Sequence, residues 1–272
     1  MYETILHPSD FTETSQIAFT HALRIALAAK AELQLLHVAT PTGHCNFSDF
    51  PKVRNTLEAW DIIPKGSDRS AVPRLGIDVN KLIIEGNHPV SAISSYLEME
   101  PSSLIVMAAH TSSHRWLSHS RSEAVSRASN AATLFVPDEA SGFILPDTGA
   151  VRLKNILVPV ATQPSPSIVF EAVENLTQLV GAERATVHIL HVGTKATLPA
   201  IPTVATQNIY QVHVLEGNLV ESIIEHAARL DADLMAMATD GHDGFMDAVR
   251  GSTTEQVLRR AHCALLAIPP GR

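Results

Sequence analysis

Aromatic side chains are scarce in this sequence and make up 5% of its 272 residues. Proteins that bind single-stranded nucleic acid stack the bases on aromatic rings and hold the phosphates with an excess of Lys and Arg. Here acidic residues outnumber basic residues, and the formal net charge is −8. The composition therefore argues against a nucleic-acid-binding groove, while a small phosphate-bearing ligand held by backbone N–H groups stays compatible with an acidic protein.

Cysteine and long apolar runs are also lacking. The two cysteines, Cys45 and Cys263, fall at unlike places in the two halves, which predicts free thiols in a reducing compartment. The N-terminus has no basic segment followed by an apolar core, and no apolar run reaches the roughly 18 residues that a membrane-spanning helix requires. From the sequence we expect a cytoplasmic protein that contacts neither membrane nor nucleic acid.

The sequence does contain an internal repeat. Three short motifs occur twice in the same order, while the spacing between them drifts: ILHP at 5–8 and ILVP at 156–159, LHV at 36–38 and 190–192, and EGN at 85–87 and 216–218. Two diverged copies of one unit, of which one has a deletion, account for this pattern. We therefore predict a tandem duplication with domains at 1–139 and 154–272, joined by a linker at 140–153 that contains Gly142, Pro146 and Gly149.

Strands and helices alternate within each copy. Runs such as LIVMA at 104–108 are apolar throughout, as the strands of a sheet covered on both faces require. Alternation with helices predicts parallel strands joined by right-handed crossovers. The expected fold is α/β, with two tandem doubly wound, Rossmann-like domains, each a five-stranded, mainly parallel sheet with flanking helices.

The expected elements follow the repeat. In the first copy we predict strands at 4–8, 32–38, 79–85, 104–108 and 133–136, with helices at 12–29, 52–69, 89–98 and 123–129. In the second copy we predict strands at 155–160, 185–192, 209–215, 234–238 and 264–268, with helices at 166–180, 219–230 and 253–260. The second copy has 16 residues (193–208) where the first has 40 (39–78), so we expect it to lack its second helix.

A glycine-containing loop follows the strand at 234–238 and leads into a helix that begins near Thr253. Gly241 and Gly251 let the backbone turn tightly, and backbone N–H groups backed by the positive end of a helix can hold an anion. Ser252 and Thr253 stand where a hydroxyl can cap the helix and donate to a phosphate oxygen. Such a loop can also serve only to cap a helix, so both roles stay open at this point.

Taken together, these residues resemble the universal stress protein family over nearly the whole chain. The resemblance is carried by ILHPSDFTETSQIAFTHAL and ILVPV at the first strands, by LLHV and ILHV at the second, by EGN before the third helix, and by ATDGHDGFMDAVRGSTTEQVLRRAHCALLAIP near the C-terminus. Nucleotide-binding members have a loop similar to G-x2-G-x9-G-[S/T]. Here the loop reads Ala238-x2-Gly241-x9-Gly251-Ser252, with alanine in place of the first glycine.

The resemblance implies a stress-response regulatory protein that binds ATP or a related nucleotide, with Mg²⁺ beside the phosphates, in a fold similar to that of the adenine nucleotide alpha hydrolases. It assigns the nucleotide to eight residues of the second domain: Val160, Ala161, Val192, Ala238, Gly241, Gly251, Ser252 and Thr253. It also implies that the strands at 133–136 and 264–268 pair within the chain, with a homodimer as a further assembly.

The two halves depart from the family pattern at different places. Asp10 matches the acidic residue that contacts the nucleoside in the family, whereas the second half has Ala161 there. Conversely, the first half has no glycine between 108 and 122, and His119 falls opposite Gly251. The sequence thus predicts a modified nucleotide site in the second half beside a degenerate first half. The alternative is a nucleotide-independent interaction or dimerisation module in which both sites are inactive.

Two polar clusters can be interpreted as metal sites, and neither interpretation is adopted. His110, His114 and His119 lie close together, but their spacing is not a known ligand pattern, so a solvated polar loop is expected. The aspartates at 240, 243 and 247 could hold Mg²⁺ beside phosphates, yet an exposed acidic loop is the simpler account. No nucleophile stands beside a base, so no catalytic residue is assigned and at most slow ATP hydrolysis is expected.

Overall fold

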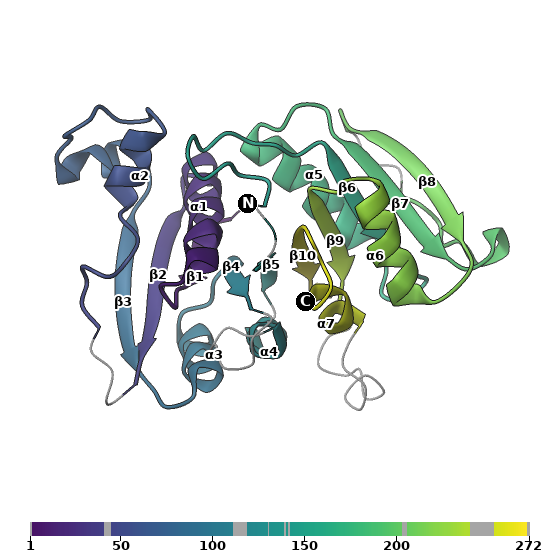
Figure 1. The fold of residues 1–272 in the computed structure, drawn as a ribbon, viewed down its shortest axis with the longest axis horizontal. Coiled ribbons are helices and arrows are strands. Elements are labelled where there is room, and N and C mark those ends of the chain that lie inside the picture. The colour runs from purple at the N-terminus through teal and green to yellow at the C-terminus, as the bar shows by residue number, and fades with distance from the viewer. Residues whose placement is uncertain are drawn as a thin grey trace.

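Ten strands form one continuous sheet in the computed structural model, which describes residues 2–40, 45–110, 119–129, 131–138, 140, 142–202, 206–239 and 253–270. The strand order is β3-β2-β1-β4-β5-β10-β9-β6-β7-β8 (Figure 1). Strands β1 to β5 belong to the first half of the chain and β6 to β10 to the second, so each half contributes one side of the sheet. The predicted α/β fold with a mostly parallel sheet and flanking helices is confirmed.

The elements alternate as expected. The first half contains β1 (Thr4–Pro8), α1 (Glu13–Ala29), β2 (Glu32–Ala39), α2 (Val53–Ala59), β3 (Val79–Glu85), α3 (Pro89–Met99), β4 (Leu104–Ala109), α4 (His119–Ser129) and β5 (Ala132–Pro137). The second half contains β6 (Asn155–Pro159), α5 (Ser167–Val180), β7 (Thr186–Val192), β8 (Ile209–Leu215), α6 (Leu219–Arg229), β9 (Leu234–Ala238), α7 (Thr253–Leu258) and β10 (Ala264–Ile268). No helix among these is long and apolar enough to cross a bilayer.

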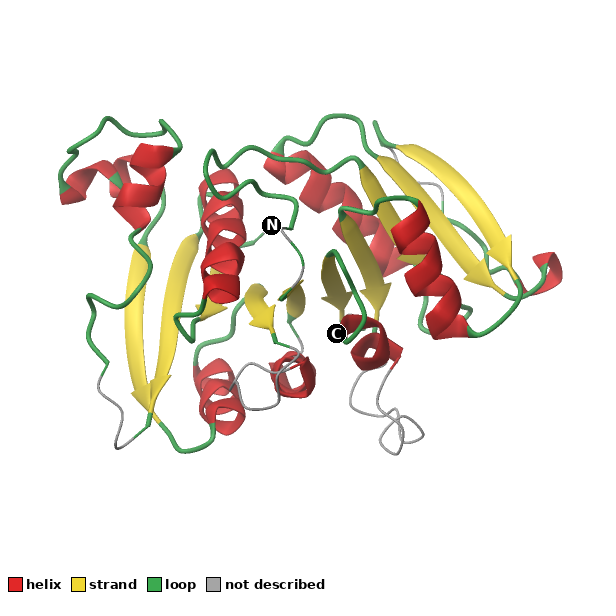
Figure 2. Cartoon of the chain, in the orientation of Figure 1, coloured by secondary structure: helices red, strands yellow, loops and turns green. Residues whose placement is uncertain are grey.

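Helices cover the sheet on both faces (Figure 2). Helices α1 and α5 contact each other on one face, and α3, α4, α7 and α6 form a row of neighbouring contacts on the other. This arrangement follows from right-handed crossovers, because the chain winds outward from β1 in one direction and from β4 in the opposite direction. Strands covered on both faces must be apolar throughout, and β4 and β10 are buried along their whole length.

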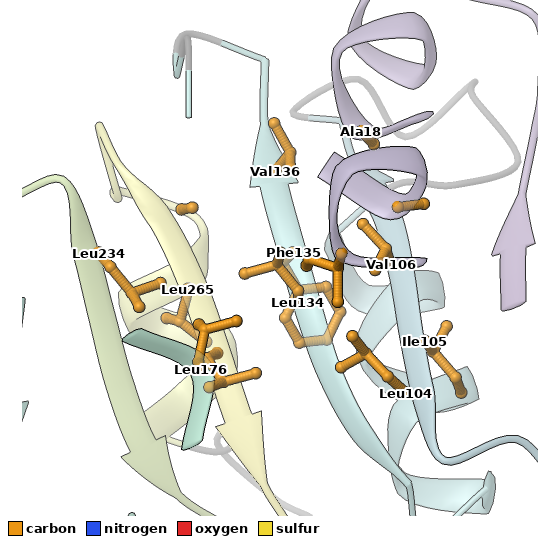
Figure 3. Packing of buried hydrophobic residues seen from close by; sticks show 14 of the residues in the cluster. Ala18, Leu104, Ile105, Val106, Leu134, Phe135, Val136, Leu176, Leu234 and Leu265 are labelled. Atoms are coloured by element: carbon orange, nitrogen blue, oxygen red, sulfur yellow. The ribbon is translucent and has the colours of Figure 1, made fainter. Parts of the chain in front are cut away.

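The two halves meet at an antiparallel pair in the middle of the sheet. Strand β5 pairs with β10, with Phe135 opposite Leu265 and Thr133 opposite Ala267, while every other pair of strands is parallel. Figure 3 shows Leu134 and Phe135 between the side chains of Leu265 and Val106. The expectation that these two strands lie together within the chain is confirmed.

Two predictions about the connections have different outcomes. The helix predicted at 52–69 is too long: α2 ends at Ala59, and the chain then turns through Asp61, which has a positive φ of 54°. Pro64 and Gly66 follow, and neither favours continuation of a helix. In the second half, the missing second helix is confirmed, because only a 3₁₀ turn (Lys195–Thr197) lies between β7 and β8 in the described residues.

The segment between the halves packs against the first half. The backbone N–H groups of Phe143 and Ile144 donate to Nε2 of His21 at 3.0 and 3.1 Å, while Nδ1 of His21 donates to the carbonyl of Ile17 at 2.9 Å. These bonds require a neutral imidazole, and burial lowers the pKa of His21 to about 4. Further along, Nε1 of Trp60 donates to the carbonyl of Pro146 at 2.7 Å. Residues 143–146 are therefore held against the first half by buried and partly buried hydrogen bonds.

Gly149 provides a test of this packing. Its φ is +67°, and a Cβ there would lie 2.5 Å from Cδ2 of Trp60, whereas Gly181 has the same φ with nothing within 4 Å of its Cβ position. We expect Gly181→Ala to cost about 1–2 kcal/mol for the left-handed backbone alone. Gly149→Ala should cost an additional ~1–3 kcal/mol because the indole must move. Urea unfolding midpoints measure both, and equal losses would contradict the packing of this segment on Trp60.

Candidate functional site

The strand order marks one place in each half as a candidate for ligand binding. In open parallel sheets, ligands bind beyond the carboxyl ends of the strands at the point where the chain winds in opposite directions. That point lies between β1 and β4 in the first half and between β6 and β9 in the second. The residues that follow Pro8 and Pro159 therefore stand at equivalent positions, but their surroundings differ.

The turn after the first strand is fixed in the same way in both halves. Nδ1 of His37 donates to the carbonyl of Ser9 at 2.7 Å, and Nδ1 of His191 donates to the carbonyl of Val160 at 3.2 Å. Both histidines come from the repeated LHV motif on the neighbouring strand. Their shared role is to anchor the backbone that carries Asp10 in one half and Ala161 in the other.

In the second half, this place holds a cavity of about 150 Å³. Its walls come from the β6–α5 connection, from α6, from the end of β9 and from the start of α7. Apolar side chains dominate, among them Val169, Leu219 and Ile223. Hydroxyls of Thr239 and Thr254 add hydrogen-bonding groups. The cavity therefore combines apolar walls with a few polar groups, as small-molecule sites commonly do.

Four of the eight residues assigned from the sequence line this cavity: Val160, Ala161, Ala238 and Thr253. Val192 lies at the carboxyl end of β7, opposite Leu215 of β8, and is not part of the lining. Gly241, Gly251 and Ser252 lie outside the described residues, as do the aspartates at 240, 243 and 247. The four lining residues come from three separate stretches of sequence, which the fold brings to one cavity.

In the first half, an ion-pair cluster occupies the equivalent place. Nε2 of His110 lies 2.9 Å from Oδ2 of Asp10, and its Nδ1 lies 2.5 Å from Oδ1 of Asp138. The side chains of His110 and Asp10 are 4% and 2% exposed. Thr12 donates to Oδ1 of Asp10 from its backbone N–H and its hydroxyl, and Thr14 donates to Asp138. The carboxylate of Asp10 is thus engaged within the protein.

The charged forms of His110 and Asp10 stabilise each other. Burial lowers the pKa of His110, but the hydrogen bonds and negative charges of Asp10 and Asp138 outweigh it and raise that pKa above its ordinary value. Burial likewise raises the pKa of Asp10, but hydrogen bonds from His110 and Thr12 outweigh it and lower the pKa. The cluster therefore favours an imidazolium that bridges two carboxylates.

The histidine cluster predicted as a solvated loop is only partly described. His110 is buried rather than solvated, because Asp10 and Asp138 hold it. His114 lies outside the described residues, and the side chain of His119 is not described. Within the part of the chain that the structure describes, no group of three or more His, Cys, Asp or Glu side chains is arranged to hold a metal ion.

Comparison with known proteins agrees with this geometry. The model of the universal stress protein family matches residues 1–137 and 202–269. The chain belongs to the universal stress protein family. The match leaves out residues 138–201, which include β6 and α5 and therefore part of the cavity wall. The second half thus departs more from the family model around its first strand, although it contains the cavity.

Curated relatives match shorter segments. A universal stress protein of Methanocaldococcus jannaschii is 38% identical over 55 residues, which are 20% of this chain and 32% of the relative. The universal stress protein E homolog of Haemophilus influenzae is 38% identical over 60 residues, which are 22% of this chain and 19% of the relative. The matched segments therefore span about a third and a fifth of these relatives.

Solved structures match the whole chain. A universal stress protein from Archaeoglobus fulgidus has a TM-score of 0.64 at 19% identity, covering 98% of this chain and 96% of its own. A protein of unknown function from Pseudomonas aeruginosa has a TM-score of 0.59 at 16% identity, covering 99% and 93%. At these identities the likeness is one of fold.

The ion-pair cluster predicts a pH-dependent loss of stability. His110→Ala leaves Asp10 buried without its cation and should cost about 3 kcal/mol near pH 5. The contribution of His110 is complete below its unfolded pKa of 6.5 and is lost as pH rises through its higher folded pKa. The contribution of Asp10 is complete above 3.8 and is lost as pH falls through its lower folded pKa. The gap between wild type and variant should therefore be widest between pH 3.8 and 6.5.

The double variant Asp10→Asn/His110→Gln is the control, because it removes both charges together and should lose less than the two single changes combined. Urea unfolding of all forms at about pH 5 and about pH 9 measures the effect. A wild-type advantage that is the same at both pH values would contradict a charged His110.

Proposed function

We propose that the chain is a stress-response regulatory protein that binds ATP or a related adenine nucleotide in its second half. One observation carries the proposal: residues that the family resemblance assigns to the nucleotide come together on one cavity. Val160 and Ala161 follow β6, Ala238 ends β9 and Thr253 begins α7. The cavity lies at the reversal point of the sheet, where this class of fold binds its ligands.

The chemistry of the cavity suits the base of a nucleotide. Its volume of about 150 Å³ is similar to that of apolar cavities that enclose a benzene ring, so it takes an aromatic ring system rather than a whole nucleotide. Leu219 and Ile223 supply apolar contacts for the faces of the ring, and Thr239 supplies a hydroxyl for its polar edge. We assign the phosphates to Gly241, Gly251 and Ser252, on the family pattern alone.

A nucleotide-independent interaction or dimerisation module is the second candidate. It is favoured by the first half, where His110 engages the carboxylate of Asp10, and by the second half, where Ala161 offers no carboxylate at all. On this interpretation the cavity is a remnant of the duplicated site. The two candidates differ in whether the purified full chain binds a nucleoside.

The domain division remains part of the proposal. We assign one domain to 1–139 and the other to 154–272, with 140–153 as the connection. The support is that each half has its own set of five strands and its own reversal point, while the connecting segment packs on α1 through His21.

Ala161→Asp tests the nucleotide assignment. It places a carboxylate where Asp10 stands in the first half, and a hydrogen bond to a charged group contributes roughly 1.5–3 kcal/mol. Since 1.4 kcal/mol is about tenfold in affinity, adenosine and ATP should both bind about tenfold more tightly. Ala161→Asn, of the same size without the charge, should gain less, and inorganic triphosphate should gain nothing. Isothermal titration of the full chain measures all of these affinities.

Gly251→Val addresses the phosphate end. A β-branched side chain at this glycine of the family pattern should block the phosphates, so ATP should no longer raise the thermal midpoint while adenosine still does. Coinciding ATP titrations for this variant and wild type would remove Gly251 from the site. If wild type itself binds neither adenosine nor ATP, and releases no small molecule in mass spectrometry after purification, the interaction module becomes the better account.

A further inference from the structure

The cavity of the second half is not built from the second half alone. Helix α4 and strand β5 of the first half also line it, through Glu123, Ser126, Arg127 and Phe135. Among the described lining residues, Arg127 is the one cation and Glu123 the one anion. The ligand would therefore lie at a junction of both halves, although the sequence assigned it to one.

The antiparallel pair in the middle of the sheet explains this geometry. Thr133, near the start of β5, lies opposite Ala267, near the end of β10. The amino edge of the first half therefore continues as the carboxyl edge of the second half, where the cavity lies. Helix α4 runs toward the start of β5, so its last turns arrive at this edge, and it contacts α7 across the junction. Figure 1 shows α4 and α7 as neighbours below β5 and β10.

We propose that Arg127 supplies the cation for the anionic part of the ligand in the second half. This inference rests on the proposed nucleotide function and extends it, because it makes the site a composite of both halves. Nucleotide phosphates carry negative charge, and the protein as a whole has a net charge of −8. Phosphates that extend from a base in this cavity therefore depend on a nearby cation to offset repulsion.

The side chain of Arg127 is suited to that role. It is 34% exposed, and its guanidinium lies 4.0 Å from Oε1 of Glu123, one helical turn before it. At 4.0 Å this i,i+4 contact is at the outer limit of an ion pair, and the guanidinium is partly exposed, so it can turn to a phosphate. Arginine also presents paired donors that match two phosphate oxygens, which a lysine cannot do.

The repeat offers a matched control. The segment SEAVSR at 122–127 corresponds to TEQVLR at 254–259, so Glu255 and Arg259 repeat the same i,i+4 ion pair on α7. The side chain of Arg259 is 57% exposed, and it is not among the residues that line the cavity. Arg259→Gln removes the same type of ion pair and the same charge at a position that does not line the cavity.

The experiment compares ATP and adenosine binding to the full chain by isothermal titration. Arg127→Gln should weaken ATP binding about tenfold to a hundredfold and leave adenosine within about twofold, because only ATP has the charge that Arg127 would meet. Arg127→Lys should recover part of the loss, since it restores the charge without the paired donors. Arg259→Gln should bind both ligands as wild type does.

Three other outcomes would overturn the inference. If Arg127→Gln binds ATP as tightly as wild type, the composite site is wrong while the nucleotide function stands. If it loses ATP and adenosine equally, with an unchanged thermal midpoint, Arg127 shapes the cavity and does not meet an anion. If wild type binds neither ligand, the proposed function fails and the inference fails with it.

Discussion

The antiparallel pairing of β5 with β10 is the constraint on which the rest of this structure depends. Each half on its own would end at an apolar strand with unpaired backbone groups, an edge that invites aggregation. Joining the two edges covers both and buries Leu134, Phe135 and Leu265 at the centre of the molecule. The pairing also reverses the second half relative to the first, so the two reversal points open at opposite edges of a single sheet.

The two halves share one backbone arrangement but have different side chains at the equivalent sites. His37 and His191 anchor equivalent turns, so the backbone of the two halves is held alike. The side chains at these turns differ: Asp10 forms a buried ion pair with His110, whereas Ala161 lines the cavity. The turn after β1 in the first half carries buried charge, and the turn after β6 in the second half lines a mainly apolar cavity.

Local sequence patterns predicted the fold well. They did not predict contacts between residues that are distant in sequence. Apolar runs such as Leu104–Ala109 and the repeated motifs were sufficient to predict the strands and the missing helix. The overlong helix at 52–69 arose because the turn at Asp61 is not marked by glycine. The site was only half predictable: Asp10 and His110 are 100 residues apart in sequence. Neither that ion pair nor the contribution of Arg127 has a local signal.

The position of β10 at the end of the chain has a consequence for biosynthesis. Strand β5 ends at Pro137, and β10 begins at Ala264, so 126 residues (138–263) separate the two partners. At about 5–20 residues per second, a ribosome needs roughly 6–25 s to make that stretch. During this interval the emerging first half presents an uncovered apolar edge to its neighbours on the polysome. The nascent chain is thus most exposed to misassembly just before its last strand appears.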